Sequence, residues 1–186
     1  MKRFFDLSFA LILLGVFSIP MVLITMLVIC SSKGPAFYWS RRNGKDNVIF
    51  SMPKFRTMKP DSPSLATHLL TDPDNFVTPI GKFLRKLSLD ELPQIYSIIK
   101  GDMSFIGPRP ALYNQNDLID LRNQFGINLS LPGLTGWAQV NGRDELTIEE
   151  KVKLELEYAE NKSIFFDIKI LLMTLSRVVK SKGISH

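Results

Sequence analysis

Cysteine and histidine are scarce in this 186-residue chain, which has only Cys30, His68 and His186. A single cysteine excludes an internal disulfide framework. Zinc sites are built mainly from cysteine and histidine side chains, so the composition also argues against a zinc protein.

Several familiar sequence fingerprints are also missing. The chain has no Gly-x-x-x-x-Gly-Lys-Ser/Thr phosphate loop, no Gly-x-Gly-x-x-Gly dinucleotide motif and no Gly-x-Ser-x-Gly nucleophile elbow. It also lacks internal repeats and any recognised nucleic-acid-binding module. These absences argue against the common nucleotide-binding and hydrolase folds and against a nucleic-acid partner.

Acidic residues are outnumbered by basic ones. The chain has 23 Lys and Arg against 18 Asp and Glu, a formal net charge of +5. A basic chain favours acidic partners such as phosphates or anionic lipid. The length predicts one domain with at most an appendage, and the 45% hydrophobic content is enough for a sizeable core.

Charge is absent from one long stretch, Leu7 to Cys30, which is mostly apolar. As a straight helix it would be about 36 Å long, enough to cross a hydrocarbon core of about 30 Å. It lacks a small-residue cleavage site at its end, which argues against a removable signal peptide. The ordinary interpretation is a single membrane-spanning anchor.

Two features favour a different path for this stretch. Pro20, with Ser18 two residues before it, lies in the middle, where proline breaks or kinks a helix. Basic residues, which prefer the cytoplasmic side, flank both ends: Lys2, Arg3, Lys33, Arg41, Arg42 and Lys45. A bent, re-entrant helix would keep both flanks on one side. The residues alone leave the spanning and re-entrant alternatives open.

The next segment predicts a β-hairpin. Strand-like pieces at 37–39 and 48–50 enclose Asn43-Gly44, a strong turn signal. Farther along, Lys54 and Arg56 alternate with Phe55, so an extended chain would point both basic side chains to one face. They would form either the solvated face of an edge strand or a phosphate clamp.

The segment 88–94 places two adjacent carboxylates, Asp90 and Glu91, near a helix start. Ser88 and Glu91 fit a capping box, in which both side chains cap that start. Pro93 is tolerated only in a first helical turn, so a helix that begins nearer Asp90 fits better and places this residue where phosphates bind. Two neighbouring carboxylates need a cation or strong hydrogen-bond donors to stay charged together, and a divalent metal on Asp90 and Glu91 is the natural candidate.

Basic and helical segments surround this pair. Residues 80–87 have helical spacing with a basic face that suits an anionic membrane surface. The helix of the carboxylates is expected to stop at Lys100-Gly101, and two prolines then fix the backbone around Arg109. Further helices are expected at 111–125, after the capping box that starts at Thr147, and at 163–182. The last is either a core helix or an interfacial one, and we favour the interface.

Four segments together resemble a known family: 54–58, 87–94, 100–110 and 135–143. In content and order they are similar to the motifs of the monotopic bacterial phosphoglycosyl transferases, the polyprenol-phosphate sugar-phosphate transferases. The resemblance covers nearly the whole chain. The short length of the chain is similar to that of the minimal members of the family, including those that transfer diacetylbacillosamine phosphate.

The resemblance implies a reaction and its site. Such enzymes transfer a phosphosugar from a UDP-sugar to undecaprenyl phosphate, release UMP, need Mg²⁺ and pass through a covalent phosphosugar–enzyme intermediate. Asp90 would be the nucleophile, and Glu91 would assist by metal ligation or by taking the acceptor's proton. The phosphate-binding candidates are Lys54, Arg56, Arg85, Arg109 and Arg143.

The expected fold is mainly α with a small β-hairpin. Residues 1–33 would form a re-entrant membrane helix broken at Ser18 and Pro20, and residues 34–186 a catalytic domain with interfacial amphipathic helices. The resemblance implies that this domain lies on the cytoplasmic face of the bacterial inner membrane.

Three positions depart from the family pattern, and the sugar is not named by it. Ile19 separates Ser18 from Pro20, Leu131 stands where a basic residue is common, and Asp144 stands where Asn is common. An N-acetylated amino sugar is the first expectation, with galactose or glucose as alternatives. A non-catalytic, membrane-anchored binding module is the alternative of another class; it explains the net charge but not the carboxylate pair.

Overall fold

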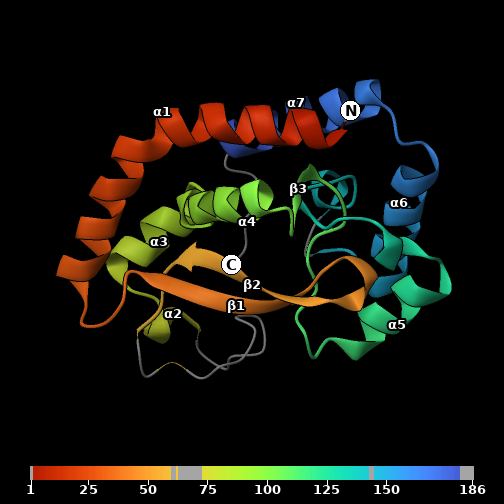
Figure 1. Ribbon diagram of the computed structural model, residues 1–186. Coiled ribbons are helices and arrows are strands. Elements are labelled where there is room, and N and C mark those ends of the chain that lie inside the picture. Colours follow the sequence, from red (N-terminus) through yellow and green to blue (C-terminus); the bar gives the residue numbers. More distant parts are fainter. Residues whose placement is uncertain (1, 60–61, 63–72, 143–144, 181–186) are drawn as a thin grey trace.

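The computed structural model describes residues 2–59, 62, 73–142 and 145–180, and shows a mainly helical chain with two small sheets (Figure 1). The predicted fold class is confirmed to that extent. The elements, in chain order, are α1 (Lys2–Ser31), β1 (Phe37–Asn43), η1 (Lys45–Asn47), β2 (Ile49–Phe55), α2 (Pro73–Phe76), α3 (Pro79–Lys86), η3 (Leu89–Gln94), α4 (Ile95–Lys100), β3 (Ser104–Ile106), α5 (Asn116–Gln124), η4 (Ile127–Leu129), β4 (Gly133–Thr135), η5 (Gln139–Asn141), α6 (Ile148–Glu160) and α7 (Ile164–Lys180).

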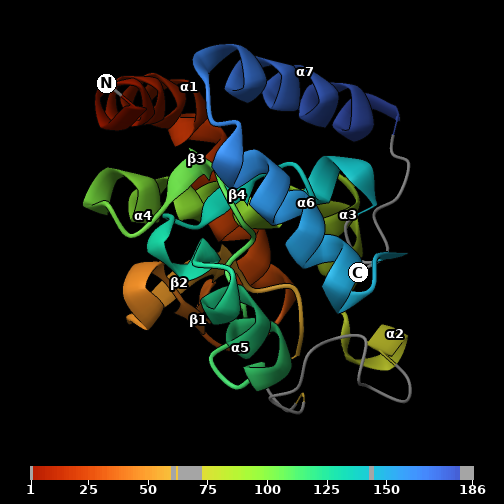
Figure 2. The same cartoon turned by 90° about the vertical axis from the view of Figure 1, so that its right-hand side faces the viewer.

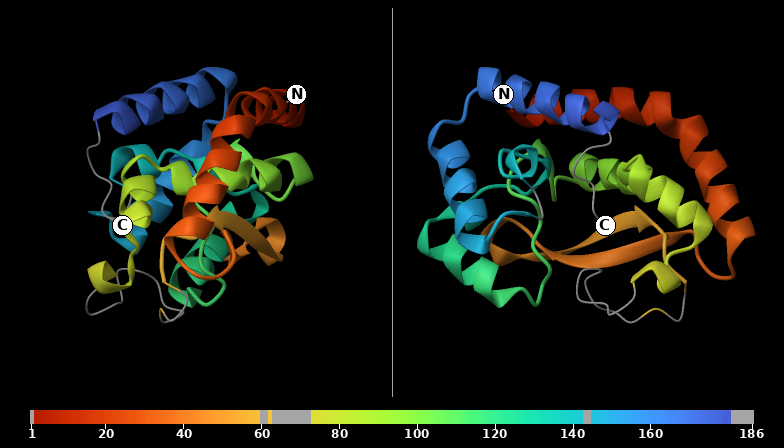
Figure 3. Two further views of the ribbon diagram at one scale, coloured as in Figure 1. Left: turned by 90° about the vertical axis from the view of Figure 1, so that its left-hand side faces the viewer. Right: turned by 180° about the vertical axis from the view of Figure 1, so that it is seen from behind.

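Helix α1 is a continuous helix of 30 residues with Pro20 inside it. It bends part of the way along, so that its first part lies along one side of the molecule and its second part turns toward the hairpin (Figures 1 and 3). Proline causes such bends because it removes a backbone hydrogen bond. The Ser18 hydroxyl donates to the carbonyl of Gly15 at 2.8 Å. By length and composition alone, α1 could cross a membrane.

Apolar contacts attach α1 to the rest of the chain at two places. Near its start, Ala10 belongs to a core cluster with Ile98 of α4 and Ile170 of α7. Near its end, Ile24 and Val28 belong to a second cluster, with side chains of β2 and α3. Many large apolar side chains of α1 nevertheless stay exposed: Phe4, Phe5, Phe9, Leu11, Ile12, Val16, Ile19, Val22, Leu23, Met26, Leu27 and Ile29.

Helix α7 lies beside the first part of α1 (Figure 2). It buries Ile170 completely, but Phe165 is 86% exposed, and Ile164, Ile168, Leu172 and Leu175 are exposed as well. One face of this helix therefore packs on the core, and the other leaves apolar side chains uncovered beside those of α1; its place in a membrane interface stays a prediction.

The hairpin is longer than predicted. β1 and β2 pair antiparallel from Phe37 opposite Phe55 to Asn43 opposite Ile49. The predicted hairpin is confirmed, but its connection runs past Asn43-Gly44 through the 3₁₀ turn η1, in which Asp46 (φ 54°) and Asn47 (φ 60°) take the left-handed conformation. Asn tolerates this region better than most residues, which lets the loop lengthen.

The carboxylate pair lies in a 3₁₀ helix rather than at the start of an α-helix. η3 runs directly into α4, with Pro93 in its last turn. Ser88 has φ 55° and makes no side-chain capping bond, so the capping-box interpretation is wrong. The predicted stop after Lys100 is confirmed, since Gly101 takes φ 102°.

Strands β3 and β4 form a short parallel pair, which the sequence analysis did not predict. The pair brings the Gly-Pro-Arg-Pro turn beside the segment after Leu131. The approach is close: a Cβ at Gly133 would lie 2.1 Å from the Gly107 nitrogen, and one at Gly136 would lie 2.1 Å from the Gly107 oxygen. Only glycine permits this contact. Later, α6 begins at the predicted capping box, in which Thr147 and Glu150 each bond to the other's backbone.

Candidate active site

The two carboxylates of η3 are the centre of a buried polar cluster. Asp90 is 4% exposed and Glu91 is 8% exposed. Three basic side chains from separate elements act on them: Lys54 from β2, Arg85 from α3 and Arg109 from the turn after β3. The structure therefore brings together five of the seven residues named as catalytic or phosphate-binding.

Glu91 is held by two cations. Its Oε1 accepts hydrogen bonds from Lys54 Nζ and from Arg109 Nη2, each at 2.8 Å. Burial lowers the pKa of Lys54, and the charge of Glu91 opposes that shift. Charge-assisted bonds of this kind fix a carboxylate firmly, so Glu91 orients the two cations and they orient it.

Asp90 is different, because its Oδ1 is buried and has no hydrogen-bond partner within the described part of the chain. Burial raises the pKa of this carboxyl above its ordinary value; Lys54 opposes the shift, Glu91 adds to it, and Arg85 and Arg109 oppose it. A buried, unsatisfied carboxylate oxygen costs free energy, and native structures rarely keep one without a functional reason. Asp90 is thus placed to react or to bind a ligand.

Arg85 faces Asp90 from the last turn of α3. Burial lowers the pKa of this guanidinium, and the charge of Asp90 opposes the shift. Its Nε donates to Thr57 Oγ1 at 2.9 Å, which joins α3 to the chain just after β2. Thr78 caps the N-terminus of α3 and so fixes where the helix begins, which places Arg85 in its last turn.

Arg42 is a cluster member that the sequence analysis missed. Burial, followed by the charge of Arg109, lowers its pKa to about 10, and Glu91 opposes that shift. Its Nη1 donates to the carbonyl of Pro110 at 3.2 Å. The sequence analysis treated Arg42 only as a basic flank. Arg42 lies two residues after Ser40 and so shares its face of β1, which the structure shows to be partly buried. In the sequence, this two-residue spacing along an expected strand is the signal that could have identified Arg42.

Two predicted phosphate ligands are not part of this cluster as described: Arg56 binds elsewhere, and Arg143 lies outside the described residues. Arg56 donates from Nη2 to the carbonyl and to the hydroxyl of Ser32, at 2.7 and 2.9 Å, and so ties the end of β2 to the segment after α1. The role of both in phosphate binding stays a prediction.

Asp90 and Glu91 are the residues of the cluster whose carboxylate chemistry would suit a magnesium ion. Mg²⁺ commonly uses one or two carboxylates and completes its shell with waters and substrate phosphates. The described residues contain no group of three or more His, Cys, Asp or Glu that could hold a metal unaided. The buried, unpartnered Asp90 Oδ1 is a suitable ligand atom, provided a phosphate-bearing substrate supplies others.

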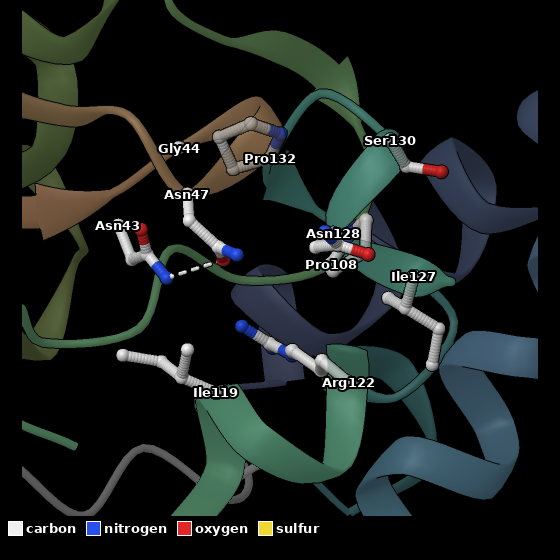
Figure 4. A pocket seen from close by; sticks show the side chains of 10 residues that line it. All are labelled: Asn43, Gly44, Asn47, Pro108, Ile119, Arg122, Ile127, Asn128, Ser130 and Pro132. Carbon is white, nitrogen blue, oxygen red and sulfur yellow. Dashed lines mark hydrogen bonds between the residues drawn. The ribbon is translucent and has the colours of Figure 1, made fainter. Parts of the chain in front are cut away.

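A small pocket lies elsewhere, between the hairpin tip and α5 (Figure 4). Its lining includes the amides of Asn43, Asn47 and Asn128 together with Arg122 and Ser130. None of the predicted site residues lines it, so it is separate from the carboxylate cluster.

Comparison with known proteins places the whole chain in one family. A family model described as bacterial sugar transferase matches residues 1–181. The uncharacterized sugar transferase EpsL of Bacillus subtilis is 40% identical over 188 residues, covering 100% of this chain and 91% of that protein.

Two longer relatives carry more specific names. The undecaprenyl-phosphate glucose phosphotransferase of Komagataeibacter xylinus is 36% identical, covering 98% of this chain and 36% of that protein. The UDP-N-acetylgalactosamine-undecaprenyl-phosphate N-acetylgalactosaminephosphotransferase of Aeromonas hydrophila is 35% identical, covering 98% of this chain and 44% of that protein. The chain thus spans nearly all of the Bacillus protein and less than half of the other two. Since the family model and these relatives cover almost the whole chain, including the carboxylate pair and its cations, the protein belongs to the bacterial sugar transferase family.

Proposed function

We propose that this protein transfers a phosphosugar from a UDP-sugar to undecaprenyl phosphate and releases UMP, through a covalent intermediate on Asp90. The observation that carries the proposal is the buried Asp90 carboxylate, whose Oδ1 is unpartnered beside a Glu91 that two cations hold. The names of the relatives support the donor and acceptor classes.

In the first step, a carboxylate oxygen of Asp90 attacks the phosphorus that bears the sugar. The bond from this phosphorus to the bridging oxygen breaks, UMP leaves with that oxygen, and the phosphosugar stays on Asp90. The positive charges of Lys54, Arg85 and Arg109 surround the carboxylate pair. They would stabilise the negative charge on the phosphate oxygens, which is the main catalytic task in phosphoryl transfer.

In the second step, a phosphate oxygen of undecaprenyl phosphate attacks the same phosphorus. The bond to Asp90 breaks, which regenerates the carboxylate and yields undecaprenyl-diphosphate sugar. Glu91, one residue from the nucleophile, would take the acceptor's proton when that phosphate enters singly protonated. Splitting the transfer in two lets the site bind one large substrate at a time.

Asp90 and Glu91 would hold Mg²⁺ together with the substrate diphosphate, and the ion would neutralise charge on the phosphate oxygens. The chain's own cations, on β2, α3 and the turn after β3, act on the same charge, but Lys54 and Arg109 are already bound to Glu91. We therefore expect catalysis to need the ion, and added EDTA to stop UMP release until excess Mg²⁺ restores it. Full turnover in EDTA would contradict the metal role.

We also propose that α1 is re-entrant and that the catalytic domain lies on the cytoplasmic face of the bacterial inner membrane. Support comes first from the start of α1. Lys2 Nζ donates to the carbonyl of Ile106 at 3.0 Å and to Tyr158 Oη at 2.6 Å, and it pairs with Asp167 at 3.1 Å. Asp6, buried, accepts from the backbone N–H of Phe105 at 3.2 Å.

Arg3 extends this attachment, because its guanidinium donates to the carbonyls of Ile98 and Ile99 at the end of α4. The other end of α1 leads to Ser32, which Arg56 binds. Both ends of the helix therefore contact the same polar body. A spanning helix would place them on opposite sides of the hydrocarbon core, about 30 Å apart.

The topology has a direct test. A cysteine added ahead of Met1, in a Cys30→Ser background, leaves Lys2, Arg3 and Asp6 unchanged. For a re-entrant helix, a membrane-impermeant maleimide should label this cysteine in inside-out vesicles and leave it unlabelled in intact cells. A cysteine in place of exposed Lys153 on α6 shows on which side of the membrane the catalytic domain lies. Labelling of the added cysteine from outside intact cells would refute re-entry.

The sugar we propose is an N-acetylated amino sugar such as diacetylbacillosamine, with glucose and galactose as alternatives. Purified protein, undecaprenyl phosphate and Mg²⁺ are to be incubated with UDP-diacetylbacillosamine, UDP-N-acetylgalactosamine, UDP-galactose and UDP-glucose, and UMP release measured. Turnover of one donor, dependent on the lipid phosphate, would establish the reaction and the sugar. Binding of donor or lipid without turnover of any donor would favour the non-catalytic binding module.

A further inference from the structure

We propose that Arg122 and Glu155 are positioning residues, which hold the main chain of Arg109 so that its guanidinium contacts Glu91. This inference rests on the proposed function for its effect on turnover. Within the described chain, neither residue hydrogen-bonds to the carboxylate pair; they act through Arg109.

The turn that carries Arg109 is held through its carbonyl oxygens. Pro108 and Pro110 have no backbone N–H, so the turn has few donors with which to bind its surroundings. Four successive carbonyls each accept a bond from another part of the chain: Pro108 from Gly133 N at 2.8 Å, Arg109 from Arg122 Nη2 at 3.0 Å, Pro110 from Arg42 Nη1 at 3.2 Å and Ala111 from Asn43 N at 2.9 Å.

Arg122 is itself fixed by a buried ion pair. Its Nε and Nη2 bind the two carboxylate oxygens of Glu155 at 2.8 and 2.5 Å, and the residues are 7% and 2% exposed. This bidentate geometry locks the plane of the guanidinium. The same Nη2 then reaches the carbonyl of Arg109. Glu155 on α6 thus fixes Arg122 on α5, and Arg122 fixes the carbonyl of Arg109 in the turn.

The path from this pair to the reaction is short. Arg109 accepts from Arg122 at its carbonyl and donates from Nη2 to Glu91 Oε1 at 2.8 Å. Arg122 and Pro108 also line the same small pocket, so the guanidinium and the turn face each other there (Figure 4). Displacements near 1 Å at a catalytic site lower rates by up to about 100-fold.

Arg122→Lys tests the inference. Lysine keeps the positive charge beside Glu155, but one ammonium cannot reproduce two parallel bonds to the carboxylate and a third to the carbonyl of Arg109. We expect kcat for UMP release to fall about tenfold, with KM for the UDP-sugar little changed. Val152→Ala is the matched control: this buried residue of α6 belongs to an apolar cluster with Leu118 of α5 and Ala111 at the end of the turn, but it carries no polar group that holds the turn, so its truncation should leave kcat near the wild-type value.

A double-mutant cycle separates positioning from plain loss of stability. In an Arg109→Ala background, Arg122→Lys should lower kcat no further, because the residue it acts through is gone. Equal losses in both backgrounds, or full activity of Arg122→Lys alone, would overturn the inference.

A second measurement does not depend on turnover. In ¹⁵N spectra of the protein in detergent micelles, the Arg109 guanidinium N–H signals should exchange with water faster in Arg122→Lys than in wild type or Val152→Ala. Unchanged exchange would overturn the inference. If wild-type protein turns over no donor, the proposed function fails, and these spectra still decide whether Arg122 positions Arg109.

Discussion

Asp90→Asn is expected to abolish UMP release, lowering turnover by about 10⁴-fold or more, while the protein stays folded. Asparagine has nearly the same shape, but its amide oxygen is too weak a nucleophile to displace UMP. The measurement is UMP release with the donor that wild-type protein uses, beside intact-protein mass spectrometry without acceptor. The phosphosugar adduct should be present on wild type and absent from the variant.

The stability of Asp90→Asn follows from the pKa of Asp90. Because burial raises this pKa in the folded chain, the folded protein binds a proton that the unfolded chain releases, and its stability falls as pH rises through that range. Holding Asp90 ionised in the folded chain therefore costs free energy that neutral asparagine avoids. The thermal midpoint should stay level or rise.

Asp120→Asn provides the control for this substitution. Asp120 is exposed on α5, away from the carboxylate pair, so Asp120→Asn changes the net charge equally without touching the site. Turnover near the wild-type rate is expected from it. The same result from Asp90→Asn would rule out Asp90 as the nucleophile.

Glu91→Ala is expected to cause the largest loss of stability, about 3 kcal/mol, together with loss of turnover. Lys54 and Arg109 each donate to Glu91 from sites that are 17% and 27% exposed, so removal of the carboxylate leaves two poorly hydrated cations facing each other. Thermal unfolding followed by circular dichroism in detergent micelles measures the change. Glu91→Gln keeps an acceptor oxygen and should lose less.

An exposed ion pair supplies the comparison for Glu91. Asp102 accepts from Lys100 at 2.8 Å, and this lysine is 55% exposed, so Asp102→Ala should lower stability far less than Glu91→Ala does. Similar losses in Glu91→Ala and Asp102→Ala would contradict the view that Glu91 organises the cations. If Asp90→Asn keeps or raises the stability and Glu91→Ala lowers it, the result would support separate roles for Asp90 and Glu91.

The sequence by itself determined the features that depend on neighbouring residues. Hydrophobic length and Pro20 predicted a long, bent α1; alternation and turn residues predicted a hairpin; Gly101 and the box at Thr147 predicted a helix end and a helix start. These signals are local, because backbone preferences and capping bonds involve residues a few positions apart. The adjacent carboxylates were visible in the same way.

Only the tertiary structure decided which side chains meet. Lys54 reaches Glu91 across 37 positions, and Arg122 reaches Glu155 across 33. Arg56, next but one to Lys54, binds Ser32 instead of the carboxylates. No local pattern distinguishes these basic residues, because their partners depend on how β2, η3, α5 and α6 pack. The same packing overrode local preference at Ser88, where a left-handed residue leads into the 3₁₀ turn and sets the two carboxylates against their cations.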